Sequence, residues 1–237
     1  MQSNPIDDKP LYRRGYDIMQ GTLIPEFGLS NCPIAIKFFY AQMEVDHFKK
    51  WHKYTIPETQ ASFSEFEHIV HTQEKIFFLE GDSLNCDTAL SHFNWQKSDG
   101  GKPSQQLQPG LLGIAMSPLK DALYVADTIH FRCDQTQAGK IIEEWQKVSG
   151  VPPLTVEKEN ALSCEGCVAV HNENLATVIH SCPKADTATS DEADLYTVIL
   201  PADHLKHFVD GINERKISLG PSPLSRPGDG FFRINLG

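Results

Sequence analysis

The sequence predicts an α/β (α+β) protein with a mixed sheet built from strand–helix units. One sign of the sheet is the run from Pro33 to Phe39, which is apolar at nearly every position, as in a buried strand. A second sign is a strand–helix unit that occurs twice in the chain. The 237 residues, 40% of them hydrophobic, are enough to build a core. We therefore expect a single domain over residues 1–237.

Other elements follow from helix caps and from the spacing of apolar residues. A first helix is expected around Leu11 to Met19. Ser62 can cap a second helix, which has one apolar face. That face consists of Phe63, Phe66, Ile69 and Val70. The segment from Lys75 to Glu80 (KIFFLE) is expected to be a strand, and Asp82-Ser83 then cap a short helix that holds Cys86.

The repeated unit covers residues 126–145 and 193–212, and each copy begins with Ala-Asp. In both copies a strand (TIHFRC or LYTVIL) precedes a helix, and the apolar positions of the two helices differ by one constant offset of 67 residues (193 − 126). Pro201 is expected in the first turn of the second helix, where its missing N–H is not needed. The pattern indicates an internal pseudo-repeat. Two unrelated strand–helix units could also align in this way.

Three segments lack periodicity. Residues 96–110 are rich in Gly, Pro, Ser and Gln, which predicts a flexible loop, either a lid or a plain insertion. A second polar loop is expected over 183–192. The Pro/Gly-rich C-terminal tail, 217–237, is expected to lie extended on the surface, where it could contact a partner subunit of a homo-oligomer.

Charge and hydropathy exclude several classes of function. Acidic residues outnumber basic ones by 31 to 21, so the formal charge is −10. A surface of this kind repels phosphate backbones and anionic lipids, and we expect neither a nucleic-acid partner nor a membrane role. The polar N-terminus does not resemble a signal peptide, and the longest apolar runs are far shorter than the roughly 18 residues of a membrane span. We therefore expect a cytoplasmic protein.

Four of the six cysteines form the main candidate site. Cys164-Glu165-Gly166-Cys167 is a C-x-x-C motif, and this spacing lets two thiolates reach one metal from a single turn, with Gly166 allowing the bend. Cys182 is followed by proline, as is common in bacterial iron–sulfur motifs. Cys86 is expected in the first turn of its helix, where the helix dipole stabilises a thiolate. In a reducing compartment these residues predict an iron–sulfur cluster of the 4Fe-4S type, with zinc as the alternative metal.

The cysteines also allow two other interpretations. They could be buried free thiols that pack as small hydrophobic side chains, which is what we expect of Cys32 and Cys133. The C-x-x-C pair could instead be a redox dithiol, which usually follows a strand and begins a helix. The preceding segment, Glu157 to Leu162, does not have the pattern of a strand. The sequence therefore favours a metal over a redox dithiol.

Other polar residues have both a functional and an ordinary explanation. Lys37 interrupts an apolar strand and could direct a cation at a buried anion or cluster, or extend to water as strand-end lysines do. His180 could be a metal ligand or proton donor, or a solvent-facing strand residue. His68 and His71, beside Glu67, could form a second metal site, although a polar helix face explains them more simply. The chain has no G-x-G-x-x-G, Walker, G-x-S-x-G or H-E-x-x-H motif.

The order of these motifs resembles domain of unknown function 169, a family found mainly in anaerobic bacteria and archaea. The resemblance runs from about Pro33 to Ile212 and includes the FFLEGDSLNCDTAL segment, the C-x-x-C and Cys182. It implies that Cys86, one of Cys164 and Cys167, and Cys182 match the family's cysteines. A further family cysteine, on the helix before KIFFLE, is replaced here near Glu65. The resemblance implies no particular substrate or reaction.

Taken together, the sequence predicts an iron–sulfur protein of redox or lyase type. It would act on a small-molecule substrate or with a redox partner protein. Cys86, Lys37 and His180 are the candidate catalytic residues, with Cys86 as the variable ligand or nucleophile. The alternatives are a non-enzymatic module stapled by zinc, a thiol redox protein, or a binding protein with buried thiols.

Overall fold

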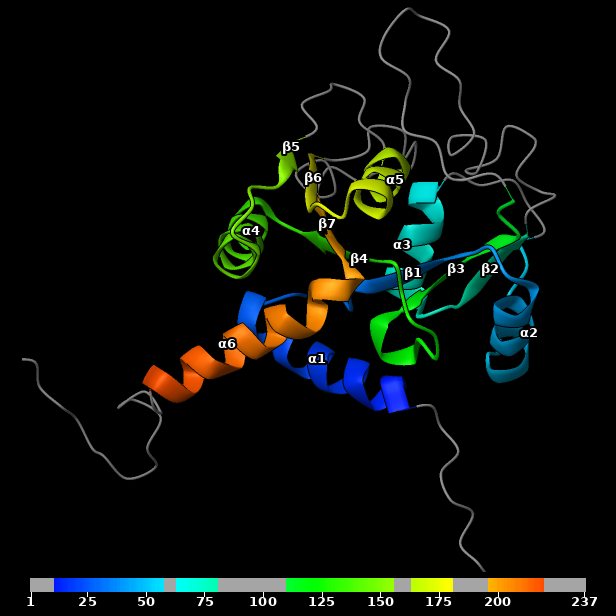
Figure 1. Cartoon of the computed structure of the whole chain (residues 1–237), viewed down its shortest axis with the longest axis horizontal. Coiled ribbons are helices and arrows are strands. Elements are labelled where there is room, and N and C mark those ends of the chain that lie inside the picture. The colour runs from blue at the N-terminus through cyan, green and yellow to red at the C-terminus, as the bar shows by residue number, and fades with distance from the viewer. Residues whose placement is uncertain (1–10, 58–62, 81–109, 156–162, 181–195, 220–237) are drawn as a thin grey trace, which may run out of the picture.

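The computed structural model describes residues 11–57, 63–80, 110–155, 163–180 and 196–219 (Figure 1). Within these ranges the strands form one seven-stranded sheet of order β2-β3-β1-β4-β7-β6-β5. All neighbouring strands are antiparallel except β5 and β6, which are parallel. The strands are β1 (Ile34–Phe39), β2 (Phe77–Glu80), β3 (Gly113–Pro118), β4 (Thr128–Cys133), β5 (Leu154–Thr155), β6 (Thr177–His180) and β7 (Tyr196–Pro201). The predicted mixed α+β fold is confirmed.

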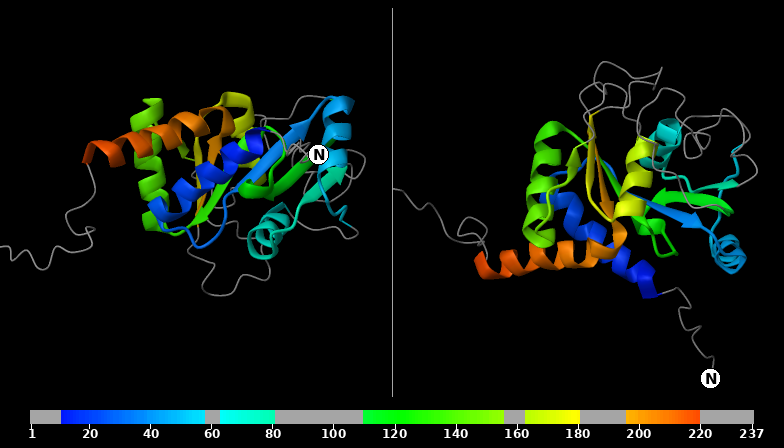
Figure 2. Two further views of the ribbon diagram at one scale, coloured as in Figure 1. Left: turned by 90° about the horizontal axis from the view of Figure 1, so that it is seen from below. Right: turned by 45° about the horizontal axis from the view of Figure 1, so that its top comes forward.

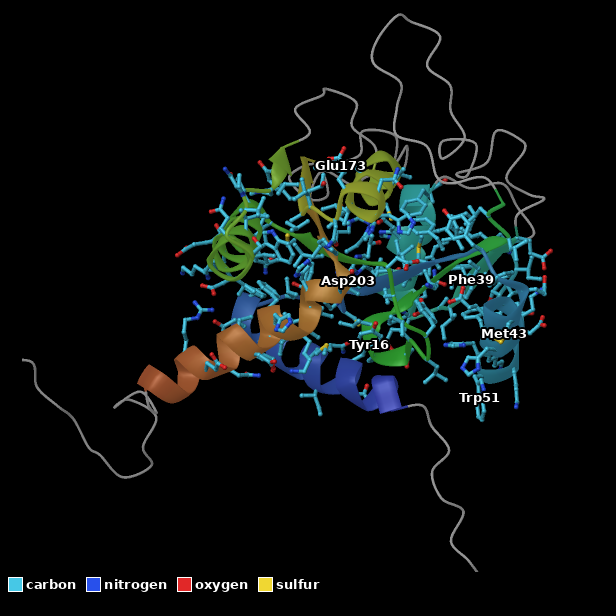
Figure 3. The ribbon with its side chains drawn as sticks, in the orientation of Figure 1. Tyr16, Phe39, Met43, Trp51, Glu173 and Asp203 are labelled. Carbon is cyan, nitrogen blue, oxygen red and sulfur yellow. The ribbon has the colours of Figure 1, made fainter. Side chains whose placement is uncertain are left out.

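Helices cover both faces of the sheet, giving three layers. One face carries α1 (Leu11–Phe27), α2 (Gln42–Trp51), α4 (Gln135–Ser149) and α6 (Leu205–Leu219). The other carries α3 (Phe63–Gln73) and α5 (Ser163–Glu173). Helices α1 and α6 contact each other on one side of the sheet, and α3 and α5 do so on the other (Figures 1 and 2). Each layer interface has its own apolar core.

The alternation of β1 shows how the strands supply both cores. Ala35 and Phe39 pack in the core beneath α1, α2, α4 and α6, whereas Ile34, Ile36 and Phe38 pack beneath α3 and α5. Burial on both faces favours apolar residues at most positions of a strand, which explains the Pro33–Phe39 run. Among the described residues, no helix has the combination of length and apolarity that is needed to cross a membrane.

The sheet contains an internal repeat that is larger than the one seen in the sequence. In the first half β1 pairs with β3 and β3 with β2, and in the second half β4 pairs with β7 and β7 with β6. The two registers agree residue by residue. Equivalent pairs are Ile34–Pro118 and Thr128–Pro201, and Phe77–Met116 and Thr177–Ile199. A short 3₁₀ turn follows in each half, Leu119–Asp121 and Ala202–His204.

An approximate two-fold axis relates the halves. Strands β1 and β4 pair symmetrically about Ala35 and Ile129, which differ by 94 positions (129 − 35). Helices α3 and α5 start 100 positions apart (163 − 63) and precede equivalent strands. Each ends in a tight turn with a residue at positive φ, Glu74 at 51° and Asn174 at 54°. The axis therefore passes between β1 and β4, on the face where α3 and α5 touch.

Several sequence expectations need correction. Both predicted strand–helix units exist, as β4–α4 and β7–α6, but the registers make β4 equivalent to β1 and β7 equivalent to β3. Pro201 ends β7 instead of opening a helix, and α6 begins at Leu205. Helix α6 continues to Leu219, so the first residues of the expected tail are helical. The expected loops at 96–110 and 183–192 lie outside the described residues, except for Gly110 in a turn.

Candidate functional site

A row of polar side chains lies on the face of β4 that α3 and α5 cover. In this strand Ile129, Phe131 and Cys133 pack in the opposite core, so Thr128, His130 and Arg132 project towards α3 and α5. Thr128 and His130 are fully buried there. The first half of the molecule has the apolar Ile34 and Ile36 at the equivalent positions. The polar row is therefore a property of the second half only.

The buried polar groups form a continuous chain from a carboxylate to a thiol. Glu67 Oε1 on α3 lies 2.5 Å from His130 Nδ1. His130 Nε2 lies 3.3 Å from Thr128 Oγ1, and this hydroxyl lies 3.2 Å from Cys167 Sγ on α5. Cys167 and His130 are inaccessible to solvent, and Glu67 is 5% exposed. The chain links both helices of this face across the central strand.

The hydrogen atoms of this series of hydrogen-bonded side chains can be arranged consistently in two ways. If Cys167 is a thiol, it can donate to Thr128 while Thr128 donates to His130 Nε2 and His130 Nδ1–H donates to Glu67. If the sulfur is a thiolate, it can only accept, so Thr128 donates to it and His130 Nε2–H donates to Thr128. The chain can thus deliver a hydrogen bond to a charged sulfur at a solvent-inaccessible position, where such a bond is strong.

Further basic groups surround this chain. Arg132 Nη1 donates to His68 Nδ1 at 3.4 Å, and both residues are partly buried. Burial lowers the pKa of His71 to about 4, although the nearby Glu67 charge opposes this shift. His71 Nδ1 has no hydrogen-bond partner within the described part of the chain. Because Glu67 and His71 are both buried, the expected solvated polar face of this helix is wrong.

The structure places only part of the predicted cysteine set. Cys167 lies in α5 with its thiol buried against the sheet, and Cys164 belongs to the first turn of the same helix. Cys86 and Cys182 lie outside the described residues. Within the described ranges, no three His, Cys, Asp or Glu side chains are grouped so that they could hold a metal ion. Cys32 and Cys133 are buried core thiols, as expected.

The C-x-x-C motif is helical, whereas the sequence suggested a bend at Gly166. Gly166 is instead needed for close packing of α5 on the sheet. A Cβ atom at this position would lie 2.4 Å from Ile179 Cδ1 and 3.0 Å from Ile199 Cδ1. The absence of a side chain at Gly166 lets the following Cys167 approach the strands, so that its sulfur reaches Thr128.

Lys37, another predicted site residue, lies apart from these hydrogen-bonded groups. Lys37 projects to the α2 side of β1, the face opposite Cys167, because its neighbours Ala35 and Phe39 pack there. Its ammonium group lies 3.2 Å from Asp127 Oδ1, so the anion it meets is a carboxylate of the chain. His180 is the last residue of β6, and its side chain lies outside the described part.

The sequence did not indicate Thr128, His130 or Arg132 as site residues, and it indicated Glu67 only as a neighbour of His68 and His71. One signal was present, since TIHFRC alternates polar and apolar residues. Alternation of this kind usually marks a strand with one face in water, and only the packing of α3 and α5 buries it here.

Fold and site together define a three-layer α+β protein whose buried polar chain ends at a C-x-x-C cysteine. Residues 101–211 match the family model of domain of unknown function 169, described as Uncharacterised ArCR. The resemblance suggested by the sequence is confirmed over these residues, which run from β3 into α6. No curated protein and no protein of solved structure matches the chain.

Proposed function

We propose that the chain binds an iron–sulfur cluster through Cys86, Cys164, Cys167 and Cys182 and works in redox or lyase chemistry. The observation that carries this proposal is the antiparallel packing of α5 on β6. The first turn of α5, with Cys164, lies at the end of the sheet where β6 finishes at His180. Cys182 comes two residues later. The start of α5, which holds Cys164, and the end of β6, two residues before Cys182 in the sequence, thus lie at the same end of the sheet, and this arrangement supports the proposal.

The surroundings of Cys167 suit a thiolate ligand. Val168, Val170 and Ile179 belong to the same apolar core, and the Thr128 hydroxyl is within hydrogen-bond distance of the sulfur. An apolar shell and hydrogen bonds to ligand sulfur are the two means by which proteins tune iron–sulfur centres. When bound by three cysteines, a cluster supplies one open iron that acts as a Lewis acid on a small substrate. Cys86, from a separate segment, would then be the variable ligand.

The proposal is tested on the full chain purified without oxygen. We expect a brown protein that contains iron and acid-labile sulfide, whereas zinc would leave it colourless. Cys164→Ser and Cys182→Ser should each lower the iron content and bleach the absorbance. Cys133→Ser is the matched control, because that thiol is buried in the opposite core. Unchanged iron in both ligand variants, or a wild-type protein without metal, would refute the proposal.

A second candidate function is dithiol redox chemistry, and one observation favours it. Strand β5 is parallel to β6, with α5 between them, and the C-x-x-C begins in the first turn of α5. This is the β–α–β setting in which C-x-x-C motifs form redox pairs. Cys164 and Cys167 would then lose two protons and two electrons to a disulfide substrate. Equilibration with glutathione buffers should yield a Cys164–Cys167 disulfide by peptide mapping, and both thiols remaining free under oxidising conditions would exclude this function.

A further inference from the structure

We infer that Thr128 is a positioning residue for the metal centre, holding Cys167 through a hydrogen bond from its hydroxyl to the ligand sulfur. This inference rests on the proposed function, because it assigns Cys167 as a ligand. The contact is direct: Thr128 Oγ1 lies 3.2 Å from Cys167 Sγ, and both residues are fully buried. The hydroxyl projects from the central strand β4, and the sulfur from the helix packed on it.

The direction of this hydrogen bond follows from the protonation state of a cysteine that binds a metal. A metal-bound cysteine has lost its proton, so its sulfur can only accept. The Thr128 hydroxyl must then donate to the sulfur, and its oxygen accepts from His130 Nε2 at 3.3 Å. With Nε2 protonated, a further proton lies between His130 Nδ1 and Glu67 Oε1. Glu67 and His130 therefore orient the hydroxyl, and through it they act on the sulfur.

A comparison of the two halves supports a specific role for this threonine. The two-fold axis relates Thr128 to Ile34 and His130 to Ile36, and it relates Cys167 to Glu67. Polar residues thus replace isoleucines in the half whose helix carries the cysteine. Thr177, by contrast, is equally buried on the same sheet, and its hydroxyl has no partner among the described residues. A buried threonine in this sheet does not need a hydrogen bond to a sulfur, so the pairing with Cys167 is particular to Thr128.

The hydrogen bond should have two measurable effects. It withdraws electron density from the sulfur, which raises the reduction potential of a cluster. It also holds the ligand in place, and loss of such outer partners typically weakens metal binding by about 10- to 100-fold. Thr128→Val keeps the shape of the side chain but removes the donor. We expect it to bind metal about 10- to 100-fold more weakly, in competition with a chelator, and to lower the cluster potential.

The controls separate this effect from a loss of packing. Thr128→Ser keeps the hydroxyl and should restore affinity and potential. Thr177→Val makes the same change where the hydroxyl has no partner within the described ranges, and it should match the wild type. If Thr128→Val does not fold by circular dichroism, Glu67→Gln gives the comparison, because it disturbs the shared proton and leaves Thr128 in place. It should shift the potential in the same direction.

The possible results bear on the two proposals separately. Metal-loaded wild type and a Thr128→Val variant with unchanged affinity and potential would overturn the role of Thr128 alone. Unchanged metal content in Cys167→Ser would remove Cys167 from the ligand set and overturn the inference, while the other cysteines could still bind. A wild-type protein without metal would overturn the proposed function, and this inference with it.

Discussion

Replacing Glu67 by alanine should destabilise the protein strongly. The side chains of Glu67 and His130 are only 6% and 1% exposed, and their atoms are 2.5 Å apart. Alanine at this position leaves the His130 ring buried without its partner and opens a cavity under α3. Breaking a buried pair from one side typically costs about 3–5 kcal/mol. For a chain of this size that corresponds to a fall in Tm of roughly 6–20 °C.

Urea unfolding followed by circular dichroism measures this loss. The slope of the transition should stay constant while its midpoint falls, because the change affects the folded state. Glu67→Gln keeps an acceptor for the ring and should lose less than half as much stability. Asp210→Ala breaks the exposed Lys206–Asp210 pair and should cost only about 0.5 kcal/mol. If Glu67→Ala unfolds within about 1 kcal/mol of the wild type, the buried pair does not have the role described.

Three further predictions concern groups around the site. Burial holds the pKa of His71 at about 4, below its ordinary value, so between these two pH values the unfolded chain binds a proton that the folded chain does not. The free energy of unfolding should therefore fall by about 2 kcal/mol from pH 7 to pH 5. The His71→Gln variant should lack this pH-dependent component. Gly166→Ala should lose about 1–2 kcal/mol of stability through overpacking against the sheet. Gly139→Ala should instead gain about 0.5–1 kcal/mol, because a Cβ at Gly139 would meet no atom within 4 Å and alanine favours the helix. Equal effects of the two variants on Tm would contradict this prediction. Asp127→Ala removes the carboxylate that accepts a hydrogen bond from the Phe38 N–H at 2.7 Å. In denaturant titrations this variant should lose about 1.5–3 kcal/mol of unfolding free energy, and a loss below about 0.5 kcal/mol would contradict the prediction.

Local sequence signals predicted several of the elements, although not α2 or β3. The apolar run before Phe39 became β1, and TIHFRC became β4 without any change of bounds. Helix α4 is marked by its ends: Asp134 and Gln137 form a capping box, and Gly150 ends the helix at a φ of 68°. Such features depend on neighbours in the chain, so the sequence displays them directly.

The site and the repeat depend on distant residues, and the sequence displayed them poorly. Glu67 and His130 are 63 positions apart, and neither belongs to a recognisable motif. The repeat has different offsets in different elements, 94 for β1 and β4 but 83 for β3 and β7 (201 − 118), because the connections differ in length. A search at one constant offset therefore aligned β4 with β7, which are neighbours in the sheet but not equivalent.

The position of β1 in the sheet has a consequence for the boundaries of the family domain. The matched stretch, 101–211, contains β3 and β4 but not β1, which lies between them and pairs with both. A fragment cut to those limits would leave β3 and β4 each with an open edge in the middle of the sheet, and exposed edges of this kind invite aggregation. It would also lack Glu67. An expression plasmid for this protein should therefore begin before Pro33, upstream of the matched segment.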